Sequence, residues 1–343
     1  MTIEERLSLL EQQIAAQVPT PTEYYTSRWS GEEIDNRIAS LSNRNLLDNW
    51  YFVGGGSQQG GGQFPVNQRG QIIYDTGTAS GYGIDRWWSI FCNYNVTTGV
   101  LSHSTNQTYG GSMRQAIESP GRLAGRTVVI SILVDRVTGA PSISISKSSG
   151  INSGMNFIGS TTLSNGLNTL VVNLPNDVGG DTYPMLFVSI NAMIGSSFRV
   201  IAAKLELGPT QTLAYQDEDG TWQLFETPDY GEELAKCQRY QLVLSSTDAY
   251  SSVGSGVVHT TTQARIVISL PNTLRIKPTL SYSGNFQLLT NGEGATITRI
   301  VLENINQNCI SVQATSSGLV VGQAAILRSN NDVNAKIILD ANL

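Results

Sequence analysis

Cysteine and histidine are scarce in this 343-residue sequence. Its three cysteines, Cys92, Cys237 and Cys309, are widely spaced, and no Cys-x-x-Cys occurs. An odd, scattered set disfavours a disulfide framework or a zinc site, so we expect three reduced, partly buried thiols. Each of the two histidines, His103 and His259, lies among Ser and Thr. We interpret both as surface or hydrogen-bonded residues, and not as general bases.

Long apolar runs and an excess of basic charge are also missing. No stretch approaches the length of a membrane span, so we expect no membrane insertion. The N-terminus is acidic and amphipathic, and it lacks the basic run and apolar core of a signal peptide. A net charge of −6 and a pI near 5.0 argue against a nucleic-acid partner, which would need a basic face. We therefore expect a soluble product made in the cytoplasm.

Turn formers and β-branched residues dominate instead, with 34 glycines and only 14% charged residues. This composition favours β architecture, and the length allows two or three domains. Strands are predicted at 127–134, 141–146, 170–174, 185–190 and 198–207, and then at 241–244, 257–262, 265–270, 279–282, 296–302, 309–314, 324–327 and 336–339. Short strands separated by Gly, Asn and Asp turns are typical of sandwiches and jelly rolls.

The first 44 residues have a helical pattern. Ile3, Leu7, Leu10 and Ile14 are spaced like the seam of a coiled coil, although two heptads are few and an ordinary amphipathic helix or a disordered start fits equally well. A second short helix is predicted after Ser30, which precedes Glu33 in a capping-box arrangement. We interpret residues 1–44 as a helical segment that aligns three chains.

A junction follows the first set of strands. Asp219 and Gly220 predict a tight hairpin turn. Asp229 is a candidate N-cap for a helix from Tyr230 to Arg239. The acidic run 217–219 could bind calcium, but we favour a solvated turn because calcium sites draw ligands from several backbone positions.

Several short sequence segments, called phrases below, resemble segments of bacteriophage and prophage tail-fibre proteins of the receptor-binding type. In chain order they are Asn-Leu-Leu-Asp-Asn (45–49), Pro-Val-Asn-Gln-Arg-Gly (65–70), Ile-Asp-Arg-Trp (84–87), Lys-Leu-Glu-Leu-Gly (204–208), Tyr-Gly-Glu-Glu-Leu (230–234) and Cys-Gln-Arg-Tyr (237–240). The resemblance implies a jelly-roll domain like a carbohydrate-binding module, followed by a β tip domain. The glycine-rich stretch 54–62 departs from the family pattern by lengthening a loop.

Together these features predict a mainly β chain: short coiled-coil-like N-terminal helices, a jelly-roll β-sandwich and a second, smaller C-terminal β-sandwich. The expected domains are residues 1–44, 45–210, a hairpin-helix connector at 211–240, and 241–343. Asp85 and Arg86 are expected to form a bidentate ion pair that fixes a loop to the sandwich.

Aromatic residues near asparagines are the main functional signal, because sugar C–H faces stack on aromatic rings. In the adjacent pair Trp87 and Trp88 one ring should face the core and the other should face outward. We expect Trp87 in the core and Trp88 outside. The candidate glycan-binding residues are Trp88, Asn93, Tyr94, Tyr109, Tyr250 and Tyr282.

Signals for catalysis are weak. No phosphate-binding loop, zinc spacing or complete nucleophile elbow occurs, so no cofactor or metal is expected. A glycosidase would need a carboxylate pair at a set separation, and the candidates are Asp75, Asp85, Asp135, Asp177, Asp181 and Glu206. We predict no enzyme activity.

The resulting hypothesis is a homotrimeric, non-catalytic tail-fibre protein of a virion. It would be made in the cytoplasm of the host bacterium, join other tail proteins through one terminus, and bind a cell-surface polysaccharide or other receptor. The alternatives are a virion glycan depolymerase or esterase, and a bacterial carbohydrate-binding module.

Overall fold

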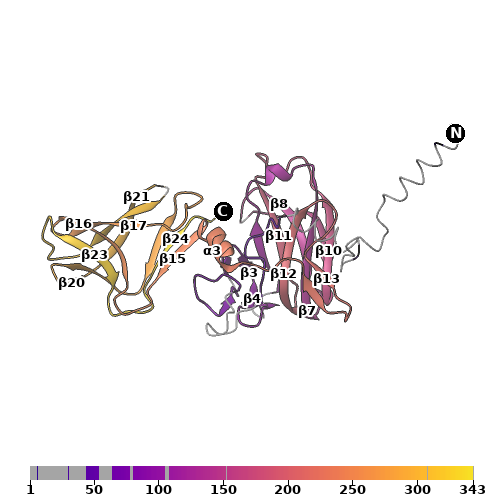
Figure 1. Ribbon diagram of the computed structural model, residues 1–343, viewed down its shortest axis with the longest axis horizontal. Helices are drawn as coiled ribbons and strands as arrows, with labels where there is room; N and C mark the ends of the chain where they lie inside the picture. The colour runs from indigo at the N-terminus through magenta and orange to yellow at the C-terminus, as the bar shows by residue number, and fades with distance from the viewer. Residues whose placement is uncertain are drawn as a thin grey trace. The chain divides into compact units, whose positions relative to one another are not determined.

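The computed structural model describes residues 44–53, 64–77, 80–104, 108–151, 153–306 and 308–342, together with Arg6 and Ser30. Most of the helical segment predicted for residues 1–44 lies outside these residues, as does the glycine-rich stretch 54–62. The regular structure of the described chain consists mostly of antiparallel strands, which confirms the predicted fold class (Figure 1). Within it, no helix has the length and apolar character needed to cross a membrane.

Two six-stranded sheets build the first sandwich. Sheet A has the strand order β1-β4-β5-β12-β7-β10, and sheet B has the order β2-β3-β6-β11-β8-β9. The strands are β1 (Ile73–Asp75), β2 (Ser80–Tyr82), β3 (Trp88–Ile90), β4 (Cys92–Asn95), β5 (Val100–His103), β6 (Gly111–Ala116), β7 (Thr127–Thr138), β8 (Ser142–Ser148), β9 (Asn156–Thr162), β10 (Gly166–Asn173), β11 (Met185–Ala192) and β12 (Ser197–Leu207).

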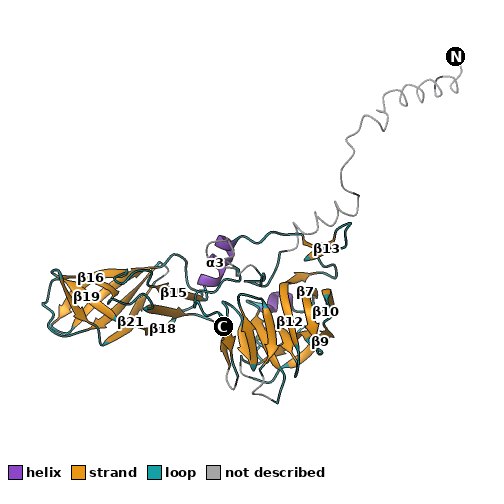
Figure 2. Cartoon of the chain, turned by 90° about the horizontal axis from the view of Figure 1, so that it is seen from below, coloured by secondary structure: helices purple, strands orange, loops and turns teal. Residues whose placement is uncertain are grey.

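Strand pairing identifies this sandwich as a jelly roll. The pairs β8–β9, β7–β10, β6–β11 and β5–β12 are nested, as in one long antiparallel hairpin. The pairs β7–β12 and β8–β11 then roll this hairpin into two facing sheets. Figure 2 shows β12, β7 and β10 side by side. Sheet B therefore has one face on the core and one face outside.

Aromatic side chains fill one end of the core. Trp87 is fully buried, as predicted, and its ring packs 5.2 Å from that of Phe52. Tyr94 is also fully buried, and its hydroxyl donates to the Phe52 carbonyl oxygen. Burial raises the pKa of the Cys92 thiol in the same core to about 11. All three cysteines are free thiols, and Cys92 and Cys237 are buried.

The second sandwich pairs a three-stranded with a seven-stranded sheet. Their orders are β15-β24-β18 and β20-β19-β23-β16-β17-β22-β21. The strands are β15 (Gln241–Ser245), β16 (Ser252–Thr260), β17 (Gln263–Ser269), β18 (Thr279–Ser283), β19 (Phe286–Thr290), β20 (Glu293–Thr296), β21 (Arg299–Ile305), β22 (Cys309–Thr315), β23 (Ala324–Ser329) and β24 (Lys336–Asp340). Side chains of both sheets, such as Leu339 and Ile266, share one core.

In the sequence, the connector follows the first sandwich and precedes the second. β13 (Ala214–Gln216) and β14 (Trp222–Leu224) form the predicted hairpin, and Gly220 at its turn has φ +76°. The Asp217 carboxylate accepts hydrogen bonds from the Gln223 side chain and the Thr221 and Asp219 amides, which lower its pKa. The acidic run is thus a turn held by its own backbone. Helix α3 (Tyr230–Gln238) follows, and the Asp229 side chain caps it by accepting from the Glu232 amide.

Four of the sequence segments singled out above, 45–49, 65–70, 84–87 and 230–234, meet at the buried Asn49. Its side chain donates to the carbonyl oxygens of Val66 and Asp85 and accepts from the Val66 amide. Its own amide donates to Glu233 of α3 at 2.7 Å, and its carbonyl oxygen accepts from the Trp87 indole. Four separate phrases are joined here by hydrogen bonds, so we assign their residues a structural role.

The predicted ion pair between Asp85 and Arg86 is wrong. Asp85 instead accepts from the amide and the side chain of Gln68, and its burial raises its pKa to about 6. Arg86 has φ +72°, which turns its side chain away to Asp48, at 2.9 Å, and over the ring of Tyr240. Adjacent residues point in different directions here, so they cannot pair.

The Lys-Leu-Glu-Leu-Gly phrase contains a buried ion pair between Lys204 and Glu206. They lie two residues apart on β12, so both face the same side, and both are fully buried. The Lys204 ammonium lies 3.4 Å from Glu206 and 2.6 Å from Glu226, and it donates to the Thr212 hydroxyl. Glu206 accepts from the Thr212 amide at 2.8 Å. This network attaches the connector to the jelly roll.

Candidate functional site

The structure does not bring the six predicted glycan-binding residues together. Trp88 lies on β3 of sheet B, and Asn93 lies on β4 of sheet A, where it is half-buried. Tyr109 is exposed in the loop before β6, and its carbonyl oxygen contacts the His103 ring. Tyr250 and Tyr282 belong to the second sandwich. The assignment of Tyr94 is wrong, because a side chain with 0% exposure cannot stack on a ligand.

Tyr250 and Tyr282 already have protein partners. The Arg328 guanidinium lies over the Tyr250 ring at 4.9 Å. The Tyr282 ring packs against Phe286, and its hydroxyl donates to the Thr298 carbonyl oxygen at 3.4 Å. Two candidates lie in polar rows across a sheet. Asn93 aligns with Asp75 and Ser102 on sheet A. Trp88 belongs to a longer row on sheet B, in a surface that also carries the exposed ring of Phe157.

This surface is the outer side of sheet B. The register aligns Trp88, Arg114, Ser189, Ser144 and Ser160 in one row across five strands. The neighbouring row, with Met113, Ile190 and Ile143, faces the core. Alternation along the strands therefore turns the first row away from the core. Arg114 and Ser189 in this row are only 6% exposed and Ser144 is 0% exposed, whereas Trp88 is half-buried and Ser160 is exposed. We call the outward row, together with Asn191 and Phe157, the polar face.

Trp88 and Arg114 form its best-defined part. The Trp88 ring is half-buried and packs edge-to-face on Tyr82, with centroids 4.9 Å apart. Arg114, its cross-strand partner, donates to the Ile151 carbonyl oxygen and lies over the Phe187 ring. Burial lowers the pKa of Arg114 to about 10. The Trp88 indole nitrogen and the Arg114 Nε are buried and have no hydrogen-bond partner in the described residues.

Small polar side chains extend this face. The Asn191 side chain donates to the hydroxyls of Ser142 and Ser144 at 3.1 and 3.0 Å. Phe157 on β9 is 69% exposed and pairs with Ser146. The groups on this face that a ligand can reach are the rings of Trp88 and Phe157 and the side chains of Asn191 and Ser160, because Arg114, Ser189 and Ser144 are buried. This set suits a ligand that offers both C–H faces and hydroxyls.

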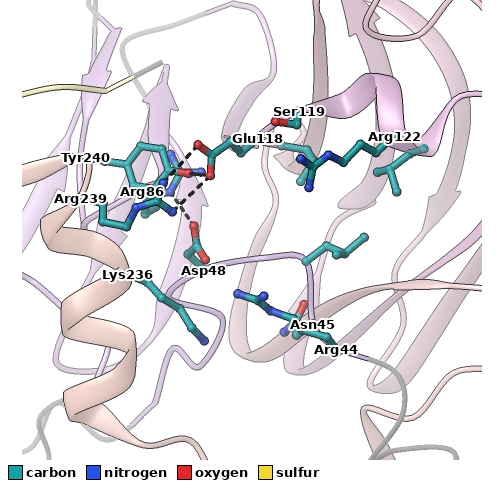
Figure 3. Close-up of a pocket in the computed structure, with 13 residues that line it drawn as sticks. Arg44, Asn45, Asp48, Arg86, Glu118, Ser119, Arg122, Lys236, Arg239 and Tyr240 are labelled. Carbon is teal, nitrogen blue, oxygen red and sulfur yellow. Dashed lines mark hydrogen bonds and ion pairs between the residues drawn. The ribbon is translucent and has the colours of Figure 1, made fainter. Parts of the chain in front are cut away.

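A second feature, which the sequence did not predict, is a pocket of about 220 Å³ beside α3 (Figure 3). Its charged lining residues come from four separate segments: Arg44, Asp48, Arg86, Glu118, Arg122, Lys236 and Arg239. Five are cationic and two are acidic. We call this the basic pocket. No local pattern in the sequence could have revealed it, because its lining residues, from Arg44 to Tyr240, lie up to 196 positions apart.

Both acidic residues of the basic pocket have partners. Asp48 pairs with Arg86, and Glu118 accepts from the Tyr240 hydroxyl at 2.8 Å and from Arg239. Burial alone would raise the pKa of Glu118, but these two donors outweigh it, and the pKa lies below its ordinary value. Glu118 is therefore ionised at neutral pH.

Most carboxylates considered for catalysis have partners in the fold. Asp135 binds Arg199, Asp177 binds Lys147, and Glu206 binds Lys204. Asp75 accepts from the Gly77 amide, and Asp181 is exposed. Among the described residues, no group of three or more His, Cys, Asp or Glu side chains could hold a metal ion.

No protein-family model matches the sequence, and no curated protein is similar to it. A Stig cyclase, Fisc from Fischerella sp. TAU, aligns with 41% of this chain and 85% of its own, at 7% identity and a TM-score of 0.28. The CBM22 tandem of Paenibacillus barcinonensis Xyn10C covers 87% of this chain and 96% of its own, at 10% identity and 0.25. The M60 catalytic domain with CBM51 domains of Clostridium perfringens ZmpB covers 79% and 37%, at 9% and 0.21. TM-scores this low carry no argument about function.

Proposed function

We propose that this chain is a receptor-binding tail-fibre protein that attaches a bacteriophage or phage-like particle to a bacterial surface through a glycan. Its place is the virion, after synthesis in the host cytoplasm, and it acts by binding without cleaving. The ordered phrases that resemble tail fibres support the virion assignment. The jelly roll followed by a second sandwich is the architecture that this resemblance implies.

The observation that carries glycan binding is the polar face. This side of the sheet is polar, with Trp88 beside Arg114 and a row of serines that ends at the exposed Ser160. Aromatic rings take the C–H faces of sugars, and amide, hydroxyl and guanidinium groups take their hydroxyls. Jelly rolls also serve as lectin domains, which is consistent with this use of the fold.

Assembly into a homotrimer is part of the proposal and rests on the heptad spacing in residues 1–18. Three weak sites on one particle would gain affinity through avidity. A mass in solution of three times the 37.0 kDa chain would support this assembly. The mass of a single chain would contradict it.

Replacing Trp88 with Ala is expected to weaken glycan binding by about thirtyfold, which corresponds to about 2 kcal/mol, because the ring is one of the two aromatic contacts on the face. Trp88→Phe keeps a ring and should lose less. The measurement is binding to an array of bacterial surface glycans, followed by titration of the best ligand.

Tyr250→Ala is the matched control, since this exposed ring lies in the other sandwich. It should bind like the wild type, and thermal unfolding must show that both variants are folded. Equal binding by wild type and Trp88→Ala would rule out the polar face. New reducing ends released from the bound glycan would show an enzyme.

A further inference from the structure

We propose that the basic pocket is a binding site for an oxyanion, a phosphate or carboxylate group borne on a unit about the size of one sugar. It shares no residue with the polar face, so it is a second site and does not depend on glycan binding there. The ligand class follows from charge, from the side chains left without partners and from size.

The pocket concentrates positive charge in an acidic protein. Five of its lining residues are cationic and two are acidic, although the whole chain carries −6. Gathering like charges costs free energy unless an anion offsets their repulsion. Asp48, Glu118 and the neighbouring Glu233 supply three carboxylates, which leaves an excess of two cations.

The ion pairs in and around the pocket show which of its cationic side chains have no partner in the described residues. Arg86 is paired with Asp48, Arg239 with Glu118, and Lys236 with Glu233. The guanidinium groups of Arg44 and Arg122 have no hydrogen bond or ion pair in the described residues. Figure 3 shows Arg44, Arg122, Lys236 and Arg239 placed around Asp48 and Glu118. Two free arginines are thus available to a single incoming group.

Arginine suits an oxyanion better than any other ligand class. Its planar guanidinium donates two parallel hydrogen bonds to a carboxylate or a phosphate. Arg44 comes from the segment that leads into the jelly roll, and Arg122 from the short 3-10 helix Pro120–Leu123. An anion between them would be held from two directions.

Size restricts the rest of the ligand. Pockets that bury a drug-sized ligand measure about 300–1,000 Å³, whereas this one measures about 220 Å³. It has room for one charged sugar unit and not for an oligosaccharide. Uronic acids and sugar phosphates both meet this description, and their shared chemistry is the oxyanion.

The test uses titration calorimetry of the full-length protein at constant ionic strength. The probes are sodium glucuronate, inorganic phosphate and, as a neutral control, glucose. We expect one saturable site per chain for at least one anion and none for glucose. Binding of glucuronate alone assigns a carboxylate, binding of phosphate alone assigns a phosphate, and binding of both assigns a general oxyanion site.

The double variant Arg44→Gln/Arg122→Gln should lose at least tenfold in affinity. Both side chains are exposed and unpaired, so the fold should be unaffected. Arg126→Gln is the matched control, because Arg126 is also exposed and lies four residues beyond Arg122, outside the pocket. It should bind like the wild type, and so should Trp88→Ala.

Two results would overturn the proposal. One is the absence of saturable binding of either anion to the wild type. The other is unchanged affinity in the double variant, since the anion would then be bound elsewhere. Trp88→Ala tests the polar face alone. A negative result at one of the two sites therefore does not contradict the proposal for the other.

Discussion

Replacing Asn49 with Ala is expected to lower the free energy of unfolding by about 4 kcal/mol. The side chain makes three buried hydrogen bonds, to the Val66 amide and to the carbonyl oxygens of Val66 and Asp85. Alanine replaces none of them, so buried backbone groups lose their partners. Asn49 also has φ +52°, which asparagine tolerates better than alanine. Urea unfolding measures the loss.

Asn331→Ala separates the two causes. Asn331 has a similar φ of +49°, but it is exposed and its side chain makes no hydrogen bond in the described residues. We expect it to cost only about 1 kcal/mol, the backbone part. If Asn49→Ala were no more costly than Asn331→Ala, Asn49 would not hold the surrounding segments together.

Replacing Lys204 with Met is expected to cost about 3–5 kcal/mol, because it leaves the fully buried Glu206 without its cation. Adding Glu206→Gln removes that charge and keeps an acceptor for the Thr212 amide. The double variant should therefore recover a large part of the loss. A double-mutant cycle followed by urea unfolding measures the coupling between the two residues.

Arg265→Met is the control for this cycle. Arg265 pairs with Glu303 at 2.9 Å, but its side chain is 56% exposed. Such a surface pair contributes about 0–1 kcal/mol, so the variant should unfold close to the wild type. Additive losses at Lys204 and Glu206 would contradict a buried, mutually dependent pair.

The sequence predicted the strands that carry strong apolar patterns. β7, β11 and β12 are central and buried, and their apolar runs allowed them to be predicted as strands. β6 (Gly-Ser-Met-Arg-Gln-Ala) and β9 (Asn-Phe-Ile-Gly-Ser-Thr-Thr) were missed, because their outward side is polar and their inward side has few large residues. Sheet pairing, and not local composition, makes them strands.

The alternation of side chains between the two sides of a strand explains where the structure places Trp88 and Tyr94. Trp87 and Trp88 are adjacent, so one must face outward, and the structure places Trp88 in the outward row. The same rule applied to β4 would have placed Tyr94 in the core and removed it from the candidate glycan-binding residues. Cys92 and Tyr94 lie on one side of that strand and are both buried, whereas Asn93 and Asn95 are half-buried.

The basic pocket and the Asn49 contacts could not have been predicted in this way. Arg44 and Arg122 are brought together by the fold, and nothing near either residue marks it as part of a site. The Asn49 side chain reaches Asp85, and its amide reaches Glu233 of α3. The phrases containing these residues suggested a family from their order, while the structure shows what they do physically: they fix the loops of the jelly roll to α3.

Binding of the labelled full-length protein to whole bacteria tests the central claim most directly. A panel of strains is first screened for binding, and cells of a binding strain are then treated with periodate, which cleaves vicinal diols of surface glycans, or with protease, which removes surface proteins. Attachment through a glycan predicts that periodate abolishes binding and that protease leaves it unchanged. Binding that survives periodate and is lost after protease would contradict the account.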